Sequence, residues 1–464
     1  MIKLSFHGAA ETVTGSKYLL ETDRAEVLID CGLFQGLKEL RERNWTPPPF
    51  PAKKVDAVVL THAHIDHIGY LPKFVKSGFR NRVYATPATV DLMSILLNDS
   101  ARNQESDAEY ANRKSFSKHH PALPLYDEAD VAHTMSRVEA VPREAWFNPA
   151  GDVWCRYHDA GHLLGSASIE VEVRQGTKPI RILFSGDVGR YDAPLYHDPK
   201  TPLPCDYLIC ESTYGNRDHG DENVLDQLCE VVHQMMNRGG VLLAASFAVG
   251  RAQQIIYLLR VLIQQGRIPE LPIYLDSPMA GAAMDVFRKY AADHDLIEMG
   301  PQTQTKVLEA ANVFLARSAE DSKRINDVVG PAVIIASSGM MTGGRILHHL
   351  KRRLPDPKST LMLGGYQAVG TRGRDIQEGR RTIRIFGRDV PVNCHVAEVS
   401  AISGHAGRSE LLRWLHPLAA PKRTFITHGE LPAAEALATT LREQRGWDVV
   451  IPKMSQSFTL EEQA

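Results

Sequence analysis

The segment "THAHIDH", residues 61–67, concentrates side chains that bind metal ions. It supplies His62, His64, Asp66 and His67 directly after the apolar run "VDAVVL". Imidazole and carboxylate groups are ligands for zinc and similar ions. On a strand, the first three of these residues would share one face and His67 would point away. A loop at the end of a strand could instead divide them between two neighbouring ions, as in two-metal hydrolases.

Residues that could complete such a pair follow other apolar runs. His162 lies in "DAGHLLGS", Asp187 in "FSGDVGR" and His428 in "FITHGE". Asp30 ends "EVLIDCG", and we interpret it as a carboxylate that orients the loop rather than as a ligand. An isolated histidine is usually a surface or core residue. The dense cluster at residues 62–67, in contrast, has little structural purpose without a cation.

The order of strands and helices predicts how these residues are positioned. Short β-type runs dominate the first 210 residues, and several end in polar loops, where sites on sheets usually lie. "TPATVDLMSILLNDSAR" is expected to be a helix. Three copies of strand, glycine-containing loop and helix follow, beginning at "VLLAAS", "IYLDSPMA" and "PAVIIASS". This order predicts a parallel sheet with helices on its faces.

After about residue 372, short strands return in "TIRIFG", "CHVAEVS" and "RTFITHGE", followed by a helix from Pro432 to about Arg445. We therefore expect an α/β protein in which one domain is split by an inserted parallel α/β domain. The expected boundaries are 1–208 for the first part, 209–371 for the insert and 372–464 for the last part.

Composition limits the function classes. The net charge of −2 and the pI near 6.8 exclude a globally basic nucleic-acid binder but not a local basic groove. The N-terminus lacks the apolar core of a signal peptide, and no apolar run approaches about 18 residues. The six cysteines are scattered without a CxxC pair. We expect a cytoplasmic protein with reduced thiols that does not enter a membrane.

Together these motifs resemble a known family. "THAHIDH", "IDCG", "AGHLLGS" and "SGDVGR" are similar to the metallo-β-lactamase fold. "ICESTYG", "FAVGRAQ", "SSGMMTGGR", "GGYQAVGTRGR", "SGHAGR" and "THGE" resemble the β-CASP nucleases. That group includes the nuclease subunit of the eukaryotic pre-mRNA 3′-end cleavage complex and its bacterial and archaeal relatives. The resemblance covers nearly the whole chain and implies an αββα sandwich with an inserted β-CASP domain.

The resemblance implies a ligand set for two Zn²⁺ ions. One ion would take His62, His64 and His162, the other would take Asp66, His67 and His428, and Asp187 would bridge them. In this family a histidine at the "THGE" position marks the branch that cuts RNA, so His428 favours RNA.

The expected reaction is hydrolysis of an RNA phosphodiester by metal-bound hydroxide, leaving 5′-phosphate and 3′-hydroxyl ends. The leaving 3′ oxygen needs a proton, which a histidine can donate near neutral pH. The resemblance assigns this role to His405, with Glu211 positioning it. The family commonly shows S-A-H-A-D here, whereas this chain has Gly407 in place of the aspartate. Endonucleolytic cleavage is expected, with 5′-to-3′ exonuclease activity left open.

Glycine–arginine loops in the insert are candidates for binding the RNA backbone. Free N–H groups at a helix start favour an anion, and arginine suits bidentate phosphate contacts. The alternative is a tight strand-to-helix turn that needs glycine. No signature for base-specific readout is present, so we expect salt-sensitive binding of single-stranded RNA through its backbone. The candidates are Arg251, Gly343, Gly344, Arg345, Arg372 and Arg374.

Two other function classes compete with a ribonuclease. A thioesterase or lactonase of the same scaffold would act on a small substrate, but such a substrate needs no inserted, arginine-rich cover. A non-enzymatic RNA-binding scaffold would typically lack metal ligands, and here every ligand position is occupied. The sequence leaves open the physiological RNA and whether the chain works alone or as a homodimer.

Overall fold

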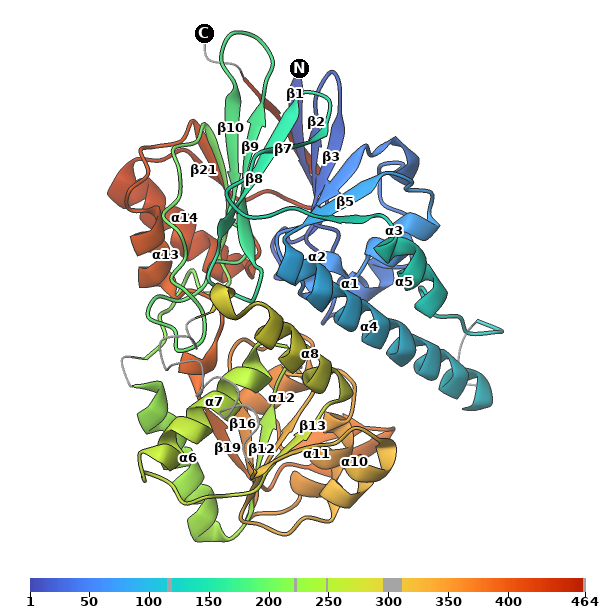
Figure 1. Ribbon diagram of the computed structural model, residues 1–464, viewed down its shortest axis with the longest axis vertical. Helices are drawn as coiled ribbons and strands as arrows, with labels where there is room; N and C mark the ends of the chain where they lie inside the picture. The colour runs from blue at the N-terminus through green and yellow to red at the C-terminus, as the bar shows by residue number, and fades with distance from the viewer. Residues whose placement is uncertain (115–118, 221–222, 248, 295–310, 462–464) are drawn as a thin grey trace. The chain divides into compact units, whose positions relative to one another are not determined.

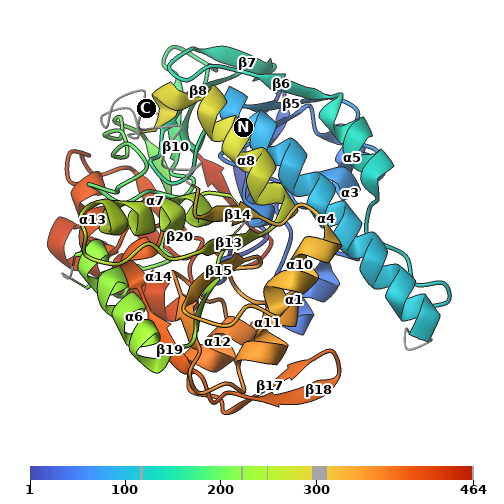
Figure 2. The same ribbon diagram turned by 60° about the horizontal axis from the view of Figure 1, so that its bottom comes forward.

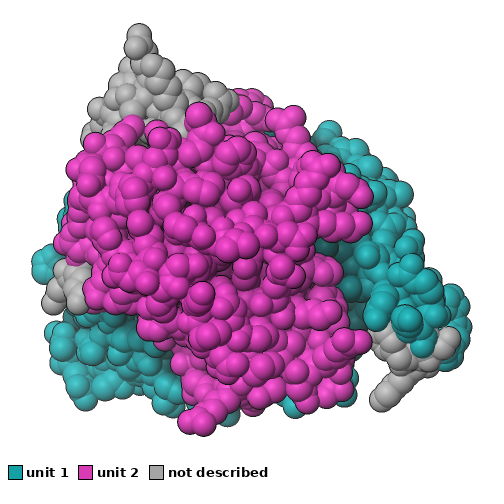
Figure 3. Space-filling view, turned by 90° about the horizontal axis from the view of Figure 1, so that it is seen from below, with its two compact units in different colours: residues 1–218, 405–464 teal, residues 219–404 magenta. Residues whose placement is uncertain are grey.

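The computed structural model describes residues 1–114, 119–220, 223–247, 249–294 and 311–461. Among these, the chain forms two compact units, coloured separately in Figure 3. Unit 1 contains Met1–Asp218 and His405–Ala464, and unit 2 contains His219–Gly404. One domain split by an insert is therefore the observed organisation.

Unit 1 contains two seven-stranded sheets. The first has the order β22 (Gln456–Leu460), β1 (Ile2–Phe6), β2 (Tyr18–Glu21), β3 (Glu26–Ile29), β4 (Ala57–Val59), β5 (Arg82–Ala85) and β6 (Val138–Ala140). The second has the order β21 (Val449–Val450), β20 (Arg423–Thr427), β11 (Tyr207–Glu211), β10 (Ile180–Phe184), β9 (Ala167–Val173), β8 (Val153–Asp159) and β7 (Phe147–Ala150). Strands β3 to β6 and β10, β11, β20 and β21 run parallel, whereas the remaining neighbours are antiparallel.

The two sheets of unit 1 pack against each other through one apolar core. Phe6 and Tyr18 from the first sheet and Tyr157, Phe184 and Phe425 from the second are buried in this core. Burial of such aromatic rings removes large apolar areas from water, which favours the face-to-face packing of the sheets.

Helices cover the outer faces of this sandwich (Figure 1). On one side lie α1 (Lys38–Arg43), α2 (Ile65–Ile68), α3 (Leu71–Lys76), α4 (Pro87–Lys114) and α5 (Glu128–Met135). On the other side lie α13 (Arg408–Leu415) and α14 (Leu431–Arg445), whose Trp414 and Leu437 pack with Leu208 and Ile426 of the second sheet. A short 3₁₀ turn, η1 (Ala52–Lys54), precedes β4. The expected αββα sandwich is confirmed, and α4 is longer than the sequence predicts.

Unit 2 is built on a parallel sheet, as expected. Its order is β14 (Val313–Leu315), β13 (Ile273–Asp276), β15 (Ala332–Ala336), β12 (Val241–Ala245), β16 (Thr360–Leu363) and β19 (His395–Glu398). Its helices are α6 (Val224–Arg238), α7 (Arg251–Gln264), α8 (Pro278–Lys289), α10 (Ala319–Asn326), α11 (Ile346–Arg353) and α12 (Arg372–Gln377), with 3₁₀ turns η2 (Ala291–Asp293) and η4 (Ser400–Ile402). Strands β17 (Thr382–Ile385) and β18 (Arg388–Pro391) form a hairpin beside α12 (Figure 2).

The bounds of unit 2 differ from the expected insert, 209–371. Two segments after residue 372 were expected to return to the first domain. Instead, β19 pairs in parallel with β16 and so extends the sheet of unit 2, and the β17–β18 hairpin precedes it in the same unit. Sequence periodicity alone does not reveal which sheet a short strand joins, because partner choice depends on contacts far apart in the chain. Of the three segments expected to return, only "RTFITHGE", which forms β20, belongs to unit 1.

Within the described residues, the helices are all too short or too polar to cross a lipid bilayer.

Helix α14 offers a test of the core of unit 1. Leu437 is fully buried, whereas Leu431 of the same helix is 39% exposed. Leu437→Ala removes buried methyl groups and leaves a cavity, so it should lower the free energy of unfolding by roughly 2–5 kcal/mol. Leu431→Ala makes the same chemical change and should cost less than about 1 kcal/mol. Urea denaturation followed by circular dichroism measures both, and equal losses would contradict the assigned packing.

Candidate metal centre

The residues predicted to bind metal lie after the carboxyl ends of strands in unit 1. The segment that carries His62 and His64 follows β4, and His64 immediately precedes α2. Asp66 and His67 lie within α2. Strand β4 therefore ends before His62. The change from loop to helix at residue 65 separates His62 and His64 from Asp66 and His67. His162 follows β8, Asp187 follows β10 and His428 follows β20.

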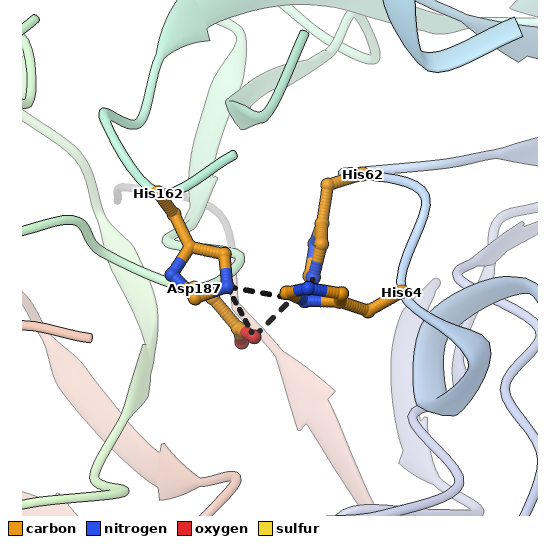
Figure 4. A group of neighbouring side chains, drawn as sticks. All are labelled: His62, His64, His162 and Asp187. Carbon is orange, nitrogen blue, oxygen red and sulfur yellow. Dashed lines mark hydrogen bonds and ion pairs between the residues drawn. The ribbon is translucent and has the colours of Figure 1, made fainter. Parts of the chain in front are cut away.

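One group of side chains consists of His62, His64, His162 and Asp187 (Figure 4). The Nε2 atom of His62 lies 2.9 Å from Nδ1 of His64, and Nε2 of His162 lies 3.1 Å from the same Nδ1. One potential ligand atom from each of the four residues lies within 4.8 Å of the others. Three imidazoles and a carboxylate therefore converge.

A second group consists of Asp66, His67 and His428. The Nε2 atoms of His67 and His428 lie 3.1 Å apart, and Nε2 of His428 lies 3.4 Å from Asp66 Oδ2. The residues of "THAHIDH" are thus divided between two groups, with His62 and His64 in one and Asp66 and His67 in the other, which is the division that the family resemblance implies.

The Asp187 carboxylate lies between the two groups. Its Oδ2 atom is 3.3 Å from His62 Nε2 and 3.5 Å from His162 Nε2. Its Oδ1 atom is 3.4 Å from His67 Nε2 and 3.5 Å from His428 Nδ1. Each oxygen therefore faces a different group, which is the arrangement that a bridging ligand requires.

The chemistry of these donors fits metal ions. Burial lowers the pKa of His62, His64 and His162, which favours the neutral imidazole that binds a metal. Asp187 Oδ1 is buried and accepts no hydrogen bond from the described residues. A buried carboxylate oxygen without a donor is costly unless a cation compensates it.

Unlike the three histidines of the first group, His67 has a raised pKa. Burial alone would lower its pKa, but the Asp187 and Asp30 carboxylates outweigh burial and raise its pKa well above the usual value. Without a metal ion, a proton on His67 supplies the positive charge that these carboxylates favour. A bound cation would take over that role, so metal binding here should release a proton.

Asp30 lies behind the second group and contacts a predicted ligand directly. Its Oδ2 atom accepts a hydrogen bond of 2.8 Å from Nδ1 of His67, which leaves Nε2 of that ring facing the centre. The Thr61 hydroxyl contacts both Asp30 oxygens, at 3.1 and 2.9 Å. This hydrogen bond fixes the orientation of the His67 ring. That Asp30 supports a metal site stays a prediction.

His405 and Glu211 form the third cluster of acid and imidazole groups. Glu211 is the last residue of β11 and is buried, and its Oε1 atom accepts a hydrogen bond of 3.2 Å from Nδ1 of His405. Nε2 of His405 lies 3.9 Å from Asp187 Oδ2. Burial alone would lower the pKa of His405, but Glu211 and Asp187 outweigh it and raise the pKa. This pair therefore lies beside the two groups, with His405 favoured in its protonated form.

Sequence reasoning missed hydroxyl groups around the centre. The Thr61 hydroxyl lies 3.0 Å from Nδ1 of His62, and the Thr213 hydroxyl lies 3.1 Å from Nδ1 of His428. Ser16 Oγ lies 3.4 Å from Nε2 of His67. Threonine and serine are common in loops, so only the position of Thr61 in "THAHIDH" and of Thr213 in "ICESTYG" could have indicated those two residues. Ser16 lies in neither motif.

The glycine–arginine loops predicted to bind phosphate belong to unit 2. Arg251 begins α7 after Gly250, whose φ of 82° requires a residue that tolerates the left-handed region. Gly344 has a φ of 78°, and a side chain at Gly343 would meet open space. Arg345 is held by Asp276, with 2.7 Å between Nη1 and Oδ1.

Arg372 and Arg374 have partners within unit 2. Arg372 donates to the backbone carbonyls of Arg384 and Met341, at 2.9 and 3.0 Å. Arg374 contacts Glu378 Oε1 at 2.6 Å. These guanidinium groups stabilise the loop structure, and a role in RNA binding stays a prediction for both.

Three family models match this chain. Residues 12–215 match the metallo-beta-lactamase superfamily, residues 252–376 match the Beta-Casp domain, and residues 389–452 match the Zn-dependent metallo-hydrolase RNA specificity domain. A crystal structure of a protein of unknown function from Enterococcus faecalis V583 has a TM-score of 0.55 at 14% identity, covering 99% of this chain and all of that one. This likeness shows the fold alone.

Three curated relatives are similar over nearly all of this chain. Ribonuclease TTHA0252 of Thermus thermophilus is 36% identical, covering 97% of this chain and 98% of that protein. The RNase J-like protein of Methanocaldococcus jannaschii is 31% identical, covering 95% and 96%. Transcription termination factor FttA of Methanosarcina mazei is 33% identical, covering 95% of this chain and 69% of that protein. These matches confirm the family expected from the motifs: the chain belongs to the β-CASP RNA nucleases of the metallo-β-lactamase superfamily, which are metal-dependent RNA hydrolases.

Proposed function

We propose that this protein is a dinuclear-zinc ribonuclease that hydrolyses RNA phosphodiesters and leaves 5′-phosphate and 3′-hydroxyl ends. The observation that carries the proposal is the Asp187 carboxylate, whose two oxygens face two separate imidazole groups. Cleavage is endonucleolytic, and 5′-to-3′ exonuclease activity is compatible with the same centre. The proposed site of action is the cytoplasm.

The proposed ligands of one zinc ion are His62, His64 and His162, those of the other are Asp66, His67 and His428, and Asp187 is shared between the ions. When bound, the ions would lower the pKa of a water molecule and neutralise charge on the phosphodiester. Asp30 orients His67 through the hydrogen bond to Nδ1 and so keeps Nε2 available.

His405 is the proposed general acid. Its Nδ1–H donates to Glu211, so the proton on Nε2 is the one that can be transferred. As the bond between phosphorus and the leaving 3′ oxygen breaks, Nε2 of His405 gives this proton to the oxygen. The His405 side chain is 13% exposed, which allows contact with a substrate atom. Glu211 is a positioning residue because it fixes the ring and favours the protonated form.

The names of the relatives support RNA as the substrate, since two of them are described as a ribonuclease and an RNase J-like protein. The glycine–arginine loops of unit 2 are proposed to bind the RNA backbone, with Arg251 and Arg345 as the main cationic groups. All seven proposed ligand positions carry metal-binding side chains, which argues against a non-enzymatic scaffold. The inserted unit 2 argues against a thioesterase or lactonase.

The chemistry at the cut ends tests the proposed reaction. Direct attack on phosphorus, without participation of the 2′-hydroxyl, should leave 5′-phosphate and 3′-hydroxyl ends on RNA. Mass spectrometry of cleaved oligoribonucleotides measures both ends. A substrate with a 2′-deoxy residue at the cut should still be cleaved, whereas 2′,3′-cyclic phosphate products would contradict the mechanism.

A sulfur leaving group tests the role of His405. His405→Ala should slow cleavage of ordinary RNA roughly 10²–10⁴-fold, because the leaving oxygen then lacks a positioned acid. A substrate with 3′-bridging sulfur needs no such proton, because a thiolate leaves readily, so the variant should cleave it at nearly the wild-type rate. Single-turnover rates on the two substrates measure this difference.

Asp187→Asn provides the control for this experiment. It alters the shared ligand rather than the acid, so it should impair cleavage of the oxygen and sulfur substrates alike. Equal losses on both substrates for His405→Ala would show that His405 is not the acid.

A further inference from the structure

The helix that follows His405 begins without a capping side chain of its own. Gly407 occupies the N-cap position of α13, with an extended backbone (φ −72°, ψ 174°). An aspartate, asparagine or serine there would accept a hydrogen bond from the backbone N–H two or three residues later. Gly407 cannot do so, so this bond must come from elsewhere.

Asp218 supplies the missing acceptor. Its Oδ1 atom accepts a hydrogen bond of 2.7 Å from the backbone N–H of Ser409, which is two residues after Gly407. Its Oδ2 atom accepts a bond of 2.8 Å from the Ser409 hydroxyl. The preceding residue contributes as well, because the carbonyl of Arg217 accepts 3.0 Å from the N–H of Arg408. A carboxylate 191 residues away in the sequence thus caps this helix.

Glu410 completes the start of the helix from the other side. Its Oε2 atom accepts 2.8 Å from the N–H of Gly407, and its Oε1 atom accepts 3.1 Å from the N–H of Tyr191. The N–H of Ala406 also donates to the carbonyl of Val188, at 2.8 Å. The loop that bears His405 is therefore fastened to the segment that follows Asp187.

The hydrogen bonds at the start of α13 connect the loop of His405 to the segments that carry Glu211 and Asp187. Residues 217–218 follow the strand that ends at Glu211, and residues 188–191 follow Asp187. Glu211 Oε1 accepts hydrogen bonds both from Nδ1 of His405 and from the N–H of Val188. A shift of α13 would consequently change the distance between His405 and both carboxylates.

We propose that Asp218 is a positioning residue for His405, which takes the place of the side chain absent at Gly407. This inference rests on the proposed function, in which His405 is the general acid. A purely structural cap would affect the stability of the protein without affecting proton donation. If Asp218 positions His405, the loss of activity in an Asp218 variant should depend on whether the leaving group needs a proton. If Asp218 only stabilises the helix, the loss should be the same for both leaving groups.

The test compares Asp218→Ala with a matched control, Asp127→Ala. Asp127 also caps a helix of unit 1, because its side chain accepts 2.9 Å from the N–H of Asp130 at the start of α5. That helix carries none of the proposed site residues. Both variants lose a capping carboxylate, so their costs in stability should be similar.

Asp218→Ala should slow cleavage of ordinary RNA roughly tenfold. This loss is smaller than the roughly 10²–10⁴-fold loss expected for His405→Ala, because His405 is still present but less well positioned. With 3′-bridging sulfur its loss should be less than about twofold, because that leaving group needs no proton. Asp127→Ala should leave the ratio of the two rates unchanged. Gly407→Asp, added to Asp218→Ala, restores a cap within α13 and should restore the ratio.

Equal losses on the two substrates, or no loss on ordinary RNA, would overturn the positioning role. So would a double variant whose ratio stays at that of Asp218→Ala. If Asp218→Ala does not fold, Asp218→Glu replaces it: the added methylene group displaces the carboxylate from Ser409, so a selective loss on ordinary RNA is expected. Equal losses on the two substrates, or no loss on ordinary RNA, would overturn the proposal.

His405→Ala separates this inference from the proposed function. If sulfur fails to rescue His405→Ala, the assignment of the acid is wrong, and Asp218 loses its proposed purpose with it. If sulfur rescues His405→Ala but Asp218→Ala behaves like Asp127→Ala, only the positioning role is wrong.

Discussion

The structure of the site depends on one buried carboxylate. Asp187 is almost fully inaccessible to solvent, and its two oxygens face two different sets of imidazoles. Burial alone would raise the pKa of this carboxyl, but the histidines around it, His428 and His67 foremost, lower it well below the usual value. An anion in this position requires positive charge on both sides. The two proposed metal ions would supply this charge, one beside each oxygen.

The sandwich of unit 1 explains how distant segments reach this carboxylate. Strands β3, β4, β8, β10 and β20 each end just before a residue of the site, and β11 ends at Glu211. Four of these six strands lie in the second sheet. Their carboxyl ends project loops toward a common edge, where backbone groups remain available and side chains need not fill the core. The apolar core formed by Phe6, Tyr157 and Phe184 therefore determines where the polar loops meet.

The sequence identifies side chains that could bind metal ions, but it does not show what surrounds them. His62, His64, Asp66 and His67 are recognisable because metal-binding side chains are rarely so dense. The family resemblance then predicted which residues belong to which group, and the geometry brings those groups together. Periodicity did not place β19 in unit 2, because strand pairing is a contact between segments far apart in the chain.

The sequence also did not reveal which residues form ion pairs or hydrogen bonds with the predicted site residues. Arg345 was predicted to contact phosphate, and the sequence did not indicate that Asp276 Oδ1 would lie 2.7 Å from its Nη1 atom. Gly407 stands where the family commonly has an aspartate. The carboxylate that accepts a hydrogen bond at the start of α13 comes instead from Asp218. Such substitutions of one side chain by another depend on tertiary structure. A departure from a family motif therefore indicates where to look for compensation, not that the function is lost.

The proposed reaction requires two metal ions that share Asp187. Anomalous X-ray diffraction at the zinc edge, from crystals of the zinc-loaded protein, tests this most directly. Two anomalous peaks about 3.5–4 Å apart, one on each side of the Asp187 carboxylate, are expected. A single peak at full zinc loading, or peaks that lie away from the Asp187 oxygens, would contradict the account.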